Sequence, residues 1–139
     1  MKDKVFSIEA FSPSSIAAPF GLYSHGISVT NPTRFLFTSG QLAISSPSKG
    51  DAIIPESALD QARVCFNNLR KILAEASMTP ADVIRIGAYV TDREYFAEYM
   101  RARDEFVEGD PPVSTLLIVS GFTRAEFKVE VEIVAASKL

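Results

Sequence analysis

The chain has 139 residues, of which 47% are hydrophobic and 22% charged, and this composition predicts a single globular domain over residues 1–139. Its net charge of −3 and its scattered basic residues argue against nucleic-acid binding, because such binding usually requires a basic stripe. No stretch approaches the ~20 apolar residues that span a bilayer, and no run of signal-peptide length occurs near the N-terminus. We therefore expect a soluble, cytoplasmic protein that makes no membrane contact.

The first third of the chain favours β-structure. Alternation over Val5–Glu9 predicts a short strand, and the two prolines and several small residues of Ser12–Phe20 predict a loop. His25–Thr30 and Phe35–Thr38 are rich in β-forming residues, and Asn31-Pro32-Thr33 between them is a turn signal. We expect these two segments to pair as a hairpin.

The middle of the chain predicts one long amphipathic helix. Ser45–Pro55 is rich in Ser, Pro and Gly, which predicts an exposed loop, and Ser57 is then suited to cap a helix. Apolar residues recur at three- and four-residue spacing as far as Ala76, which predicts about five turns with one buried stripe. The stripe comprises Ala58, Ala62, Cys65, Phe66, Leu69, Ile72, Leu73 and Ala76.

A turn, a strand and a second helix follow. Thr79–Asp82 has the signature of one short helical turn and leads into a strand over Val83–Thr91. Asp92 is placed to cap a second helix, which the two prolines of Gly109–Pro112 must end. Arg103 interrupts the apolar stripe of this helix, whose apolar positions are Phe96, Tyr99, Met100, Phe106 and Val107.

Two strands complete the chain. The nearly continuous apolar run Ser114–Val119 is typical of a strand buried on both faces, and Phe127–Ala136 alternates as a last long strand. Two helices on one face of a mixed sheet would bury both helical stripes, which predicts an α+β fold. The other face of the sheet would still carry many Phe, Val and Leu residues, and an exposed apolar patch of that size usually marks an interface. We therefore expect an oligomer.

The single cysteine and the single histidine offer little chemistry by themselves. Cys65 has apolar neighbours, and we interpret it as an inert thiol because activation of a thiolate needs a cationic, partly exposed site. His25 has no second histidine or cysteine cluster to join, so no metal site is expected.

Several segments, taken in order, resemble the RidA/YjgF family. Residues 18–26 look like its A-x-x-G-P-Y-S-Q-A loop, and residues 37–41 match its F-x-S-G-Q strand end. Residues 61–76 are similar to its long helix, with Asn68-Leu69 and Ile72-Leu73, and residues 82–92 resemble its D-V and T-D segment. Residues 129–135 look like V-E-I-E-A-I-A, so the resemblance covers the chain from about residue 4 to residue 137.

The resemblance implies a chorismate-mutase-like fold assembled as a homotrimer, with three clefts that are each lined by two neighbouring subunits. Many members of the family hydrolyse reactive enamines or imines there, such as 2-aminoacrylate, to a keto acid and ammonia, with neither a metal nor an organic cofactor. The expected partners are therefore further copies of the chain and a small metabolite, and no cofactor is expected.

One position departs from the family pattern. The catalytic arginine of the family precedes a Ser-Thr or Ser-Cys pair, and here Val113 stands at that position before Ser114 and Thr115. An arginine fork suits a substrate carboxylate. Val113, together with Met100 where the family often has asparagine, therefore shifts the expected ligand toward a less charged compound.

The resemblance also supplies the other candidate site residues. Glu130 matches the family's water-orienting glutamate and is the candidate acid/base, the alternative being a solvent-facing strand residue. Tyr23, Ser39, Gly40 and Thr115 are the remaining candidate ligand-binding residues. Their structural alternatives are a subunit contact for Tyr23, a tight turn at Ser39-Gly40, and sheet packing for Thr115. His25 takes the position of a family glutamine, as a structural donor.

Arg101, Arg103 and Arg124 are interpreted as surface residues rather than substitutes for the missing arginine.

Three functions stay open. The first is a diverged imine or enamine hydrolase that is not specific for 2-aminoacrylate. The second is a non-catalytic metabolite-binding or regulatory trimer. The third, an endoribonuclease or translation inhibitor, is disfavoured by the pI near 5.2.

Overall fold

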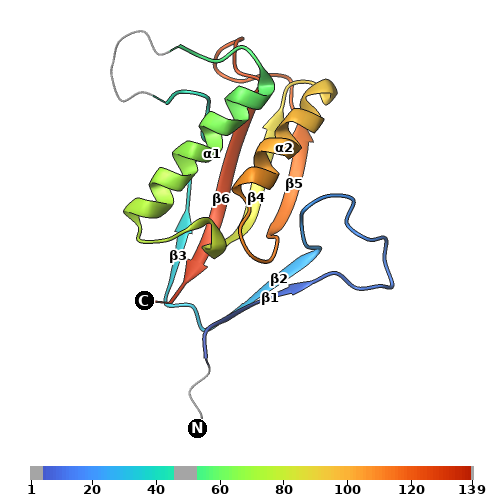
Figure 1. Ribbon diagram of the computed structural model, residues 1–139, viewed down its shortest axis with the longest axis vertical. Helices are drawn as coiled ribbons and strands as arrows, with labels where there is room; N and C mark the ends of the chain where they lie inside the picture. The colour runs from blue at the N-terminus through green and yellow to red at the C-terminus, as the bar shows by residue number, and fades with distance from the viewer. Residues whose placement is uncertain (1–4, 46–52, 139) are drawn as a thin grey trace.

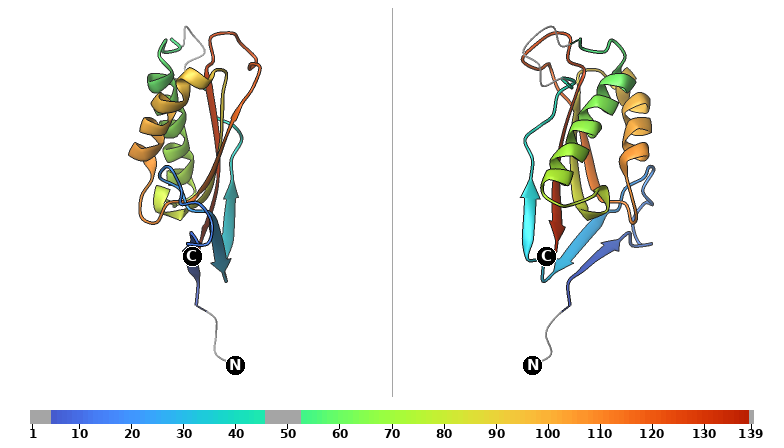
Figure 2. Two further views of the ribbon diagram at one scale, coloured as in Figure 1. Left: turned by 90° about the vertical axis from the view of Figure 1, so that its right-hand side faces the viewer. Right: turned by 60° about the vertical axis from the view of Figure 1, so that its left-hand side comes forward.

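The computed structural model describes residues 5–45 and 53–138, which form a mixed sheet covered on one face by two helices (Figure 1). Seen edge-on, both helices lie on the same side of the sheet (Figure 2). Strands β4 and β5 pair in parallel and the other neighbours are antiparallel, in the order β3-β6-β4-β5. This arrangement confirms the predicted α+β fold. The strands are β3 (Arg34–Phe37), β4 (Val83–Val90), β5 (Val113–Ile118) and β6 (Val129–Ser137).

The predicted hairpin is wrong, although both of its strands exist. Strand β2 (Gly26–Thr30) pairs with β1 (Ser7–Phe11) in a separate two-stranded ribbon, whereas β3 pairs with β6. Between β2 and β3, Asn31 has a φ of 51° and Pro32 has no amide N–H to donate, so the linker carries the chain away from β2. Pairing with β6 also places Leu36 against the hydrophobic core.

Helix α1 (Ala58–Glu75) has the predicted length and buried stripe. The Ser57 side chain accepts a hydrogen bond of 3.1 Å from the Asp60 amide and so caps the helix as expected. Phe66, Leu69 and Leu73 are buried in the core, where they join alternate residues of β6. Cys65 is fully buried and burial raises the pKa of its thiol to about 12, in agreement with an inert thiol.

Helix α2 (Phe96–Phe106) begins one turn later than the cap at Asp92. The Asp92 carboxylate accepts a hydrogen bond from the Glu94 amide at 2.9 Å, which caps a 3₁₀ turn over Arg93–Tyr95. The helix packs on α1 through the Phe66 ring, whose centroid lies 4.8 Å from that of Phe106 and 6.0 Å from that of Tyr99. Pro80–Asp82 forms the predicted short turn before β4.

Strand β5 is not buried on both faces, contrary to the prediction. It lies at one edge of the four-stranded sheet, and Leu117 is 53% exposed because helices cover only one side. Phe35 and Phe37 on β3 are exposed as well, Phe37 to 72%. The uncovered face of the sheet is thus partly apolar, as expected.

The loop predicted over 45–55 lies mostly outside the described residues. Among the residues that are described, no helix is long and apolar enough to cross a membrane.

Candidate functional site

Strand β3 ends in a β-bulge that positions Ser39 and Gly40. The Thr38 amide donates to the Ile133 carbonyl at 3.1 Å, and the Gln41 amide donates to the Val131 carbonyl at 2.7 Å. Two residues, Ser39 and Gly40, therefore oppose a single residue of β6. Bulges of this kind re-aim the chain and are frequent beside active sites.

Glu130 lies directly against Gly40. A Cβ atom built on Gly40 would sit 2.1 Å from Oε1 of Glu130, which is far inside van der Waals contact. The φ angle of Gly40 lies outside the left-handed region, so the glycine is required for close approach and not for a tight turn. Ser39, Gly40 and Glu130 thus form one unit, which we name the strand-end group.

The environment of Glu130 suits proton transfer. The residue is half-buried, and the pKa of its carboxyl is raised from its ordinary value, first by burial and second by the neighbouring charge of Glu132. Glu132 itself accepts a short hydrogen bond from the Tyr89 hydroxyl. A carboxylate whose pKa is moved toward neutrality is better matched to general acid–base catalysis.

The loop before β2 holds Tyr23 beside the start of β5. Ser24 fastens this loop, since its hydroxyl donates to the Pro111 carbonyl at 2.6 Å and its amide donates to the Pro112 carbonyl at 3.0 Å. His25 Nε2 lies 2.7 Å from the Ala17 carbonyl oxygen and closes the loop on itself, which agrees with the structural role expected for this histidine. The ring of Tyr23 packs edge-on against both Phe20 and His25.

A cavity of about 280 Å³ lies between this loop, α2 and the edge of β5. We name it the edge cavity. Tyr23 and Thr115, both expected in the site, line it, whereas Val113 is not among its lining residues. The wall consists of the aromatic residues Phe20, Tyr23 and Phe96, the consecutive strand residues Ser114, Thr115 and Leu116, and Arg103.

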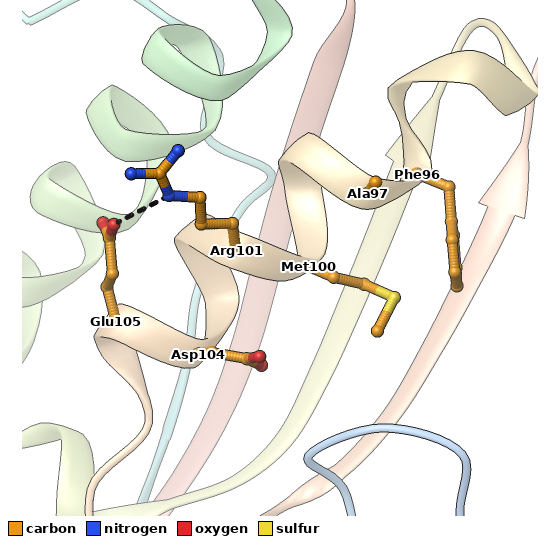
Figure 3. A pocket seen from close by; sticks show the side chains of 6 residues that line it. All are labelled: Phe96, Ala97, Met100, Arg101, Asp104 and Glu105. Atoms are coloured by element: carbon orange, nitrogen blue, oxygen red, sulfur yellow. Dashed lines mark ion pairs between the residues drawn. The ribbon is translucent and has the colours of Figure 1, made fainter.

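Met100 on α2 lies next to the edge cavity and is partly buried against the hydrophobic core. A Cβ atom on Gly21 would be 3.3 Å from the Met100 Cε atom, so the loop passes close over this side chain. Figure 3 shows Met100 and Phe96 pointing away from Arg101 and Glu105, which face α1. Both apolar residues line a shallow surface groove together with Ala97, Arg101, Asp104 and Glu105.

Arg103 is buried, and its assignment to the surface was wrong. Its side chain is only 6% exposed, whereas that of Arg101 is 67% exposed and that of Arg124 is 57% exposed, as expected for these two. The sequence contained a signal for this, because Arg103 lies four residues after Tyr99 and three before Phe106, on the face of α2 that points to the core. A charge on that face requires either a partner or a function.

The strand-end group and the edge cavity do not meet within one chain. Strand β4 separates β5 from β6, so Thr115 and Glu130 lie two strand spacings apart, roughly 10 Å. Within residues 5–45 and 53–138, no group of three or more His, Cys, Asp or Glu side chains could hold a metal ion. The strand-end group and the edge cavity are therefore two separate candidate groups within the chain.

The fold and these two groups define a small α+β protein with a candidate ligand site at the edge of a mixed sheet. A Rid family protein, YyfB of Yersinia pestis, has the same fold with a TM-score of 0.81 and 28% sequence identity, over 93% of this chain and 98% of that chain. The structure of Escherichia coli TdcF with bound serine matches with a TM-score of 0.66 at 22% identity, over 94% and 99% of the two chains.

The sequence comparisons agree with this class. The family model described as Endoribonuclease L-PSP matches residues 14–137, and the chain belongs to that family, the RidA/YjgF family. A RutC family protein of Pyrococcus horikoshii is 30% identical over 135 residues, 97% of this chain and 98% of the relative. TdcF of Escherichia coli, whose name describes a proposed reactive intermediate deaminase, is 27% identical over 118 residues, 83% and 86% of the two chains.

Proposed function

We propose that this protein hydrolyses reactive imines or enamines in clefts between the subunits of a homotrimer, and that 2-aminoacrylate is not its preferred substrate. The observation that carries the proposal is the contact between Glu130 and Gly40, which holds a half-buried carboxylate of raised pKa at a strand end. The name of the relative TdcF supports the same reaction class. A cytoplasmic location stays a prediction.

The chemistry requires one base that can also act as an acid. An enamine first gains a proton from solvent on carbon and becomes a protonated imine. Glu130 then accepts a proton from water as the water oxygen bonds to the imine carbon and the C–N π electrons move to nitrogen. In the second step Glu130 returns the proton to nitrogen. The Glu130 carboxylate then accepts the proton of the hydroxyl group as the carbonyl group forms, the C–N bond breaks and ammonia leaves with the bonding electrons. Glu130 finally releases that proton to solvent.

The homotrimer explains why each chain carries two partial sites. The uncovered sheet face exposes Phe35, Phe37 and Leu117, and exposed apolar patches commonly mark interfaces. A neighbouring copy seated against this face would bring a strand-end group toward the edge cavity of the first copy. Ser39, Gly40 and Glu130 would then come from one subunit, and Tyr23, Met100, Val113 and Thr115 from the next.

Val113 underlies the choice against 2-aminoacrylate. Valine cannot provide the bidentate hydrogen bonds with which arginine holds a small carboxylate at that position. Loss of a desolvated charge partner typically weakens binding by about 30- to 4,000-fold. A compact substrate with few other contacts would therefore bind poorly, and a larger one that also fills the edge cavity would be favoured.

A turnover assay with a matched variant tests the proposal. Imines generated by an amino-acid oxidase from several amino acids are supplied to the wild type and to Glu130→Gln, and ammonia release is followed. We expect acceleration by the wild type and none by Glu130→Gln, while both bind keto-acid products equally well. Equal ammonia release with and without the wild-type protein across the panel would contradict catalysis.

The second candidate is a metabolite-binding trimer without catalysis, which the valine at position 113 favours. It predicts saturable ligand binding with no turnover of any imine. An endoribonuclease, the activity in the family's description, is the least favoured function because the chain has a net charge of −3.

A further inference from the structure

Arg103 places a permanent positive charge inside the protein. It lies in the last turn of α2, and its side chain is only 6% exposed. Moving a guanidinium out of water is costly unless hydrogen bonds and an opposite charge compensate for the lost hydration. The surroundings of this side chain therefore indicate what it is for.

Within the described residues the compensation is incomplete. Asp104 accepts hydrogen bonds from Nε at 3.2 Å and from Nη2 at 3.1 Å, both through the single oxygen Oδ1. These contacts use two of the five N–H groups of the guanidinium. Asp104 is itself 47% exposed, so solvent screens part of its interaction with Arg103. Arg103 thus keeps hydrogen-bonding capacity and positive charge for another partner.

The Arg103 side chain reaches the wall of the edge cavity. Arg103 lines this cavity together with Tyr23 and Thr115. The backbone of the preceding loop passes directly over it, since a Cβ atom on Gly21 would lie 3.0 Å from Nη2. The loop backbone therefore packs against Nη2, the nitrogen that also donates to Asp104.

A second buried polar group lies beside Arg103. The Tyr99 hydroxyl, one turn earlier on α2, makes no hydrogen bond of normal geometry among the described residues. Burial raises its pKa to about 12, and the neighbouring Arg103 and Ser114 only partly oppose that rise. The hydroxyl is therefore neutral at pH 7 and adds no negative charge to the partial compensation that Asp104 gives Arg103.

We infer that Arg103 is the anion-binding residue of the edge cavity and holds the carboxylate of a ligand whose apolar part lies against Phe20, Tyr23 and Phe96. The inference rests on the proposed function for the location of the site, and it replaces the expectation of a weakly charged ligand. An arginine on α2, and not one at the start of β5, then determines the preference for a ligand with a carboxylate. Three aromatic side chains in the wall favour a substituent larger than that of 2-aminoacrylate.

The binding of two ligand analogues to the wild-type protein, one with a carboxylate and one without, tests the inference directly. Phenylpyruvate carries the carboxylate and phenylacetone lacks it, and both are titrated calorimetrically. We expect phenylpyruvate to bind at least tenfold more tightly. Equal affinities, or no saturable binding of phenylpyruvate at millimolar concentration, would overturn the inference, and neither measurement depends on a variant that must fold.

Variants of two arginines on the same helix separate binding from structure. Arg103→Met keeps most of the apolar stem, and we expect it to weaken phenylpyruvate binding by about 30-fold or more without lowering thermal stability. Arg101→Met, a change at an exposed position, should leave both unchanged. An Arg103→Met protein that melts earlier yet binds phenylpyruvate as the wild type does would show a purely structural role.

The binding tests of Arg103 can succeed or fail independently of whether the protein hydrolyses imines. Arg103-dependent binding in a protein that hydrolyses no imine would sustain the anion site and end the proposal of catalysis. Conversely, imine hydrolysis with the same KM in the wild type and in Arg103→Met would sustain catalysis and overturn the role of Arg103.

Discussion

At the residue scale, the close contact between Gly40 and Glu130 means that adding a single methyl group to Gly40 tests the role of Glu130. Gly40→Ala would place a methyl group 2.1 Å from Oε1 of Glu130 and force that carboxylate to move. A displacement of about 1 Å at a catalytic group can lower the rate by roughly 100-fold, so we expect a loss of that order in kcat. Gly121→Ala is the control, since a Cβ atom there meets no other atom within 4 Å. Equal kcat values for the two variants would remove Glu130 from the mechanism.

The raised pKa of Glu130 predicts a pH-dependent contribution to stability. Above its ordinary value of 4.5, the folded protein holds this proton while the unfolded chain has lost it, so the free energy of unfolding falls as pH rises through that window. Glu130→Gln removes this contribution. The stability of the variant relative to the wild type should therefore rise with pH across the window and then level off.

Urea denaturation at a series of pH values from about pH 4 to pH 8 measures this difference. Glu108→Gln, a change at an exposed position, serves as control and should give a flat difference. A flat difference for Glu130→Gln as well would show that its carboxyl titrates alike in both states.

The sequence predicted the site unevenly at this scale. The segment around Ser39 and Gly40, and the position of Glu130, followed from their resemblance to family motifs. The burial of Arg103 did not, because a charge within an apolar stripe is usually read as the edge of that stripe. The spacing of Arg103 from Tyr99 and Phe106 was a signal for the core face, and the packing of these two residues shows that α2 turns this side chain inward.

At the element scale, Gln61 joins α1 to two loops. Its Nε2 donates to the Pro55 and Glu126 carbonyls, and its Oε1 accepts from the Lys128 amide, each at 2.8 Å. Gln61→Leu would leave these three backbone groups without their partner, at a cost of about 2–4 kcal/mol. Asn67→Ala, at an exposed position of the same helix, should change the free energy of unfolding by less than about 0.5 kcal/mol. Urea denaturation distinguishes the two, and equal losses would contradict this role of Gln61.

Element boundaries followed well from periodicity where the signal was local. The Ser57 cap and the five turns of α1 were predicted because helical hydrogen bonds and capping depend on neighbours in sequence. The partner of β3 was not, since pairing with β6 joins Arg34 to Ser137, more than a hundred residues away. Alternation predicts a strand, but it does not specify which of several strands lies beside it.

At the scale of the whole molecule, the uncovered sheet face predicts association. We expect sedimentation equilibrium to give three times the chain mass of 15.2 kDa. Phe37→Asp places a charge on a residue of that face and should shift the mass toward the monomer. Val5→Asp, which changes a side chain of similar exposure, should not. A wild-type monomer at micromolar concentration would contradict the trimer.

The proposed active site is built from two copies of the chain. Two variants test this, each with one defect: Glu130→Gln disables the strand-end group, and Thr115→Trp fills the edge cavity. Neither should hydrolyse imines alone. The two variants are then mixed in equal amounts under conditions in which subunits exchange, and the unfractionated mixture is assayed for ammonia release.

Random mixing of equal amounts should restore about a quarter of the wild-type activity if each site takes one part from each of two neighbours, because a quarter of the sites then receive both intact parts. If both parts belonged to the same chain, every site in the mixture would still carry one defect. A mixture no more active than its parents would therefore contradict the shared site.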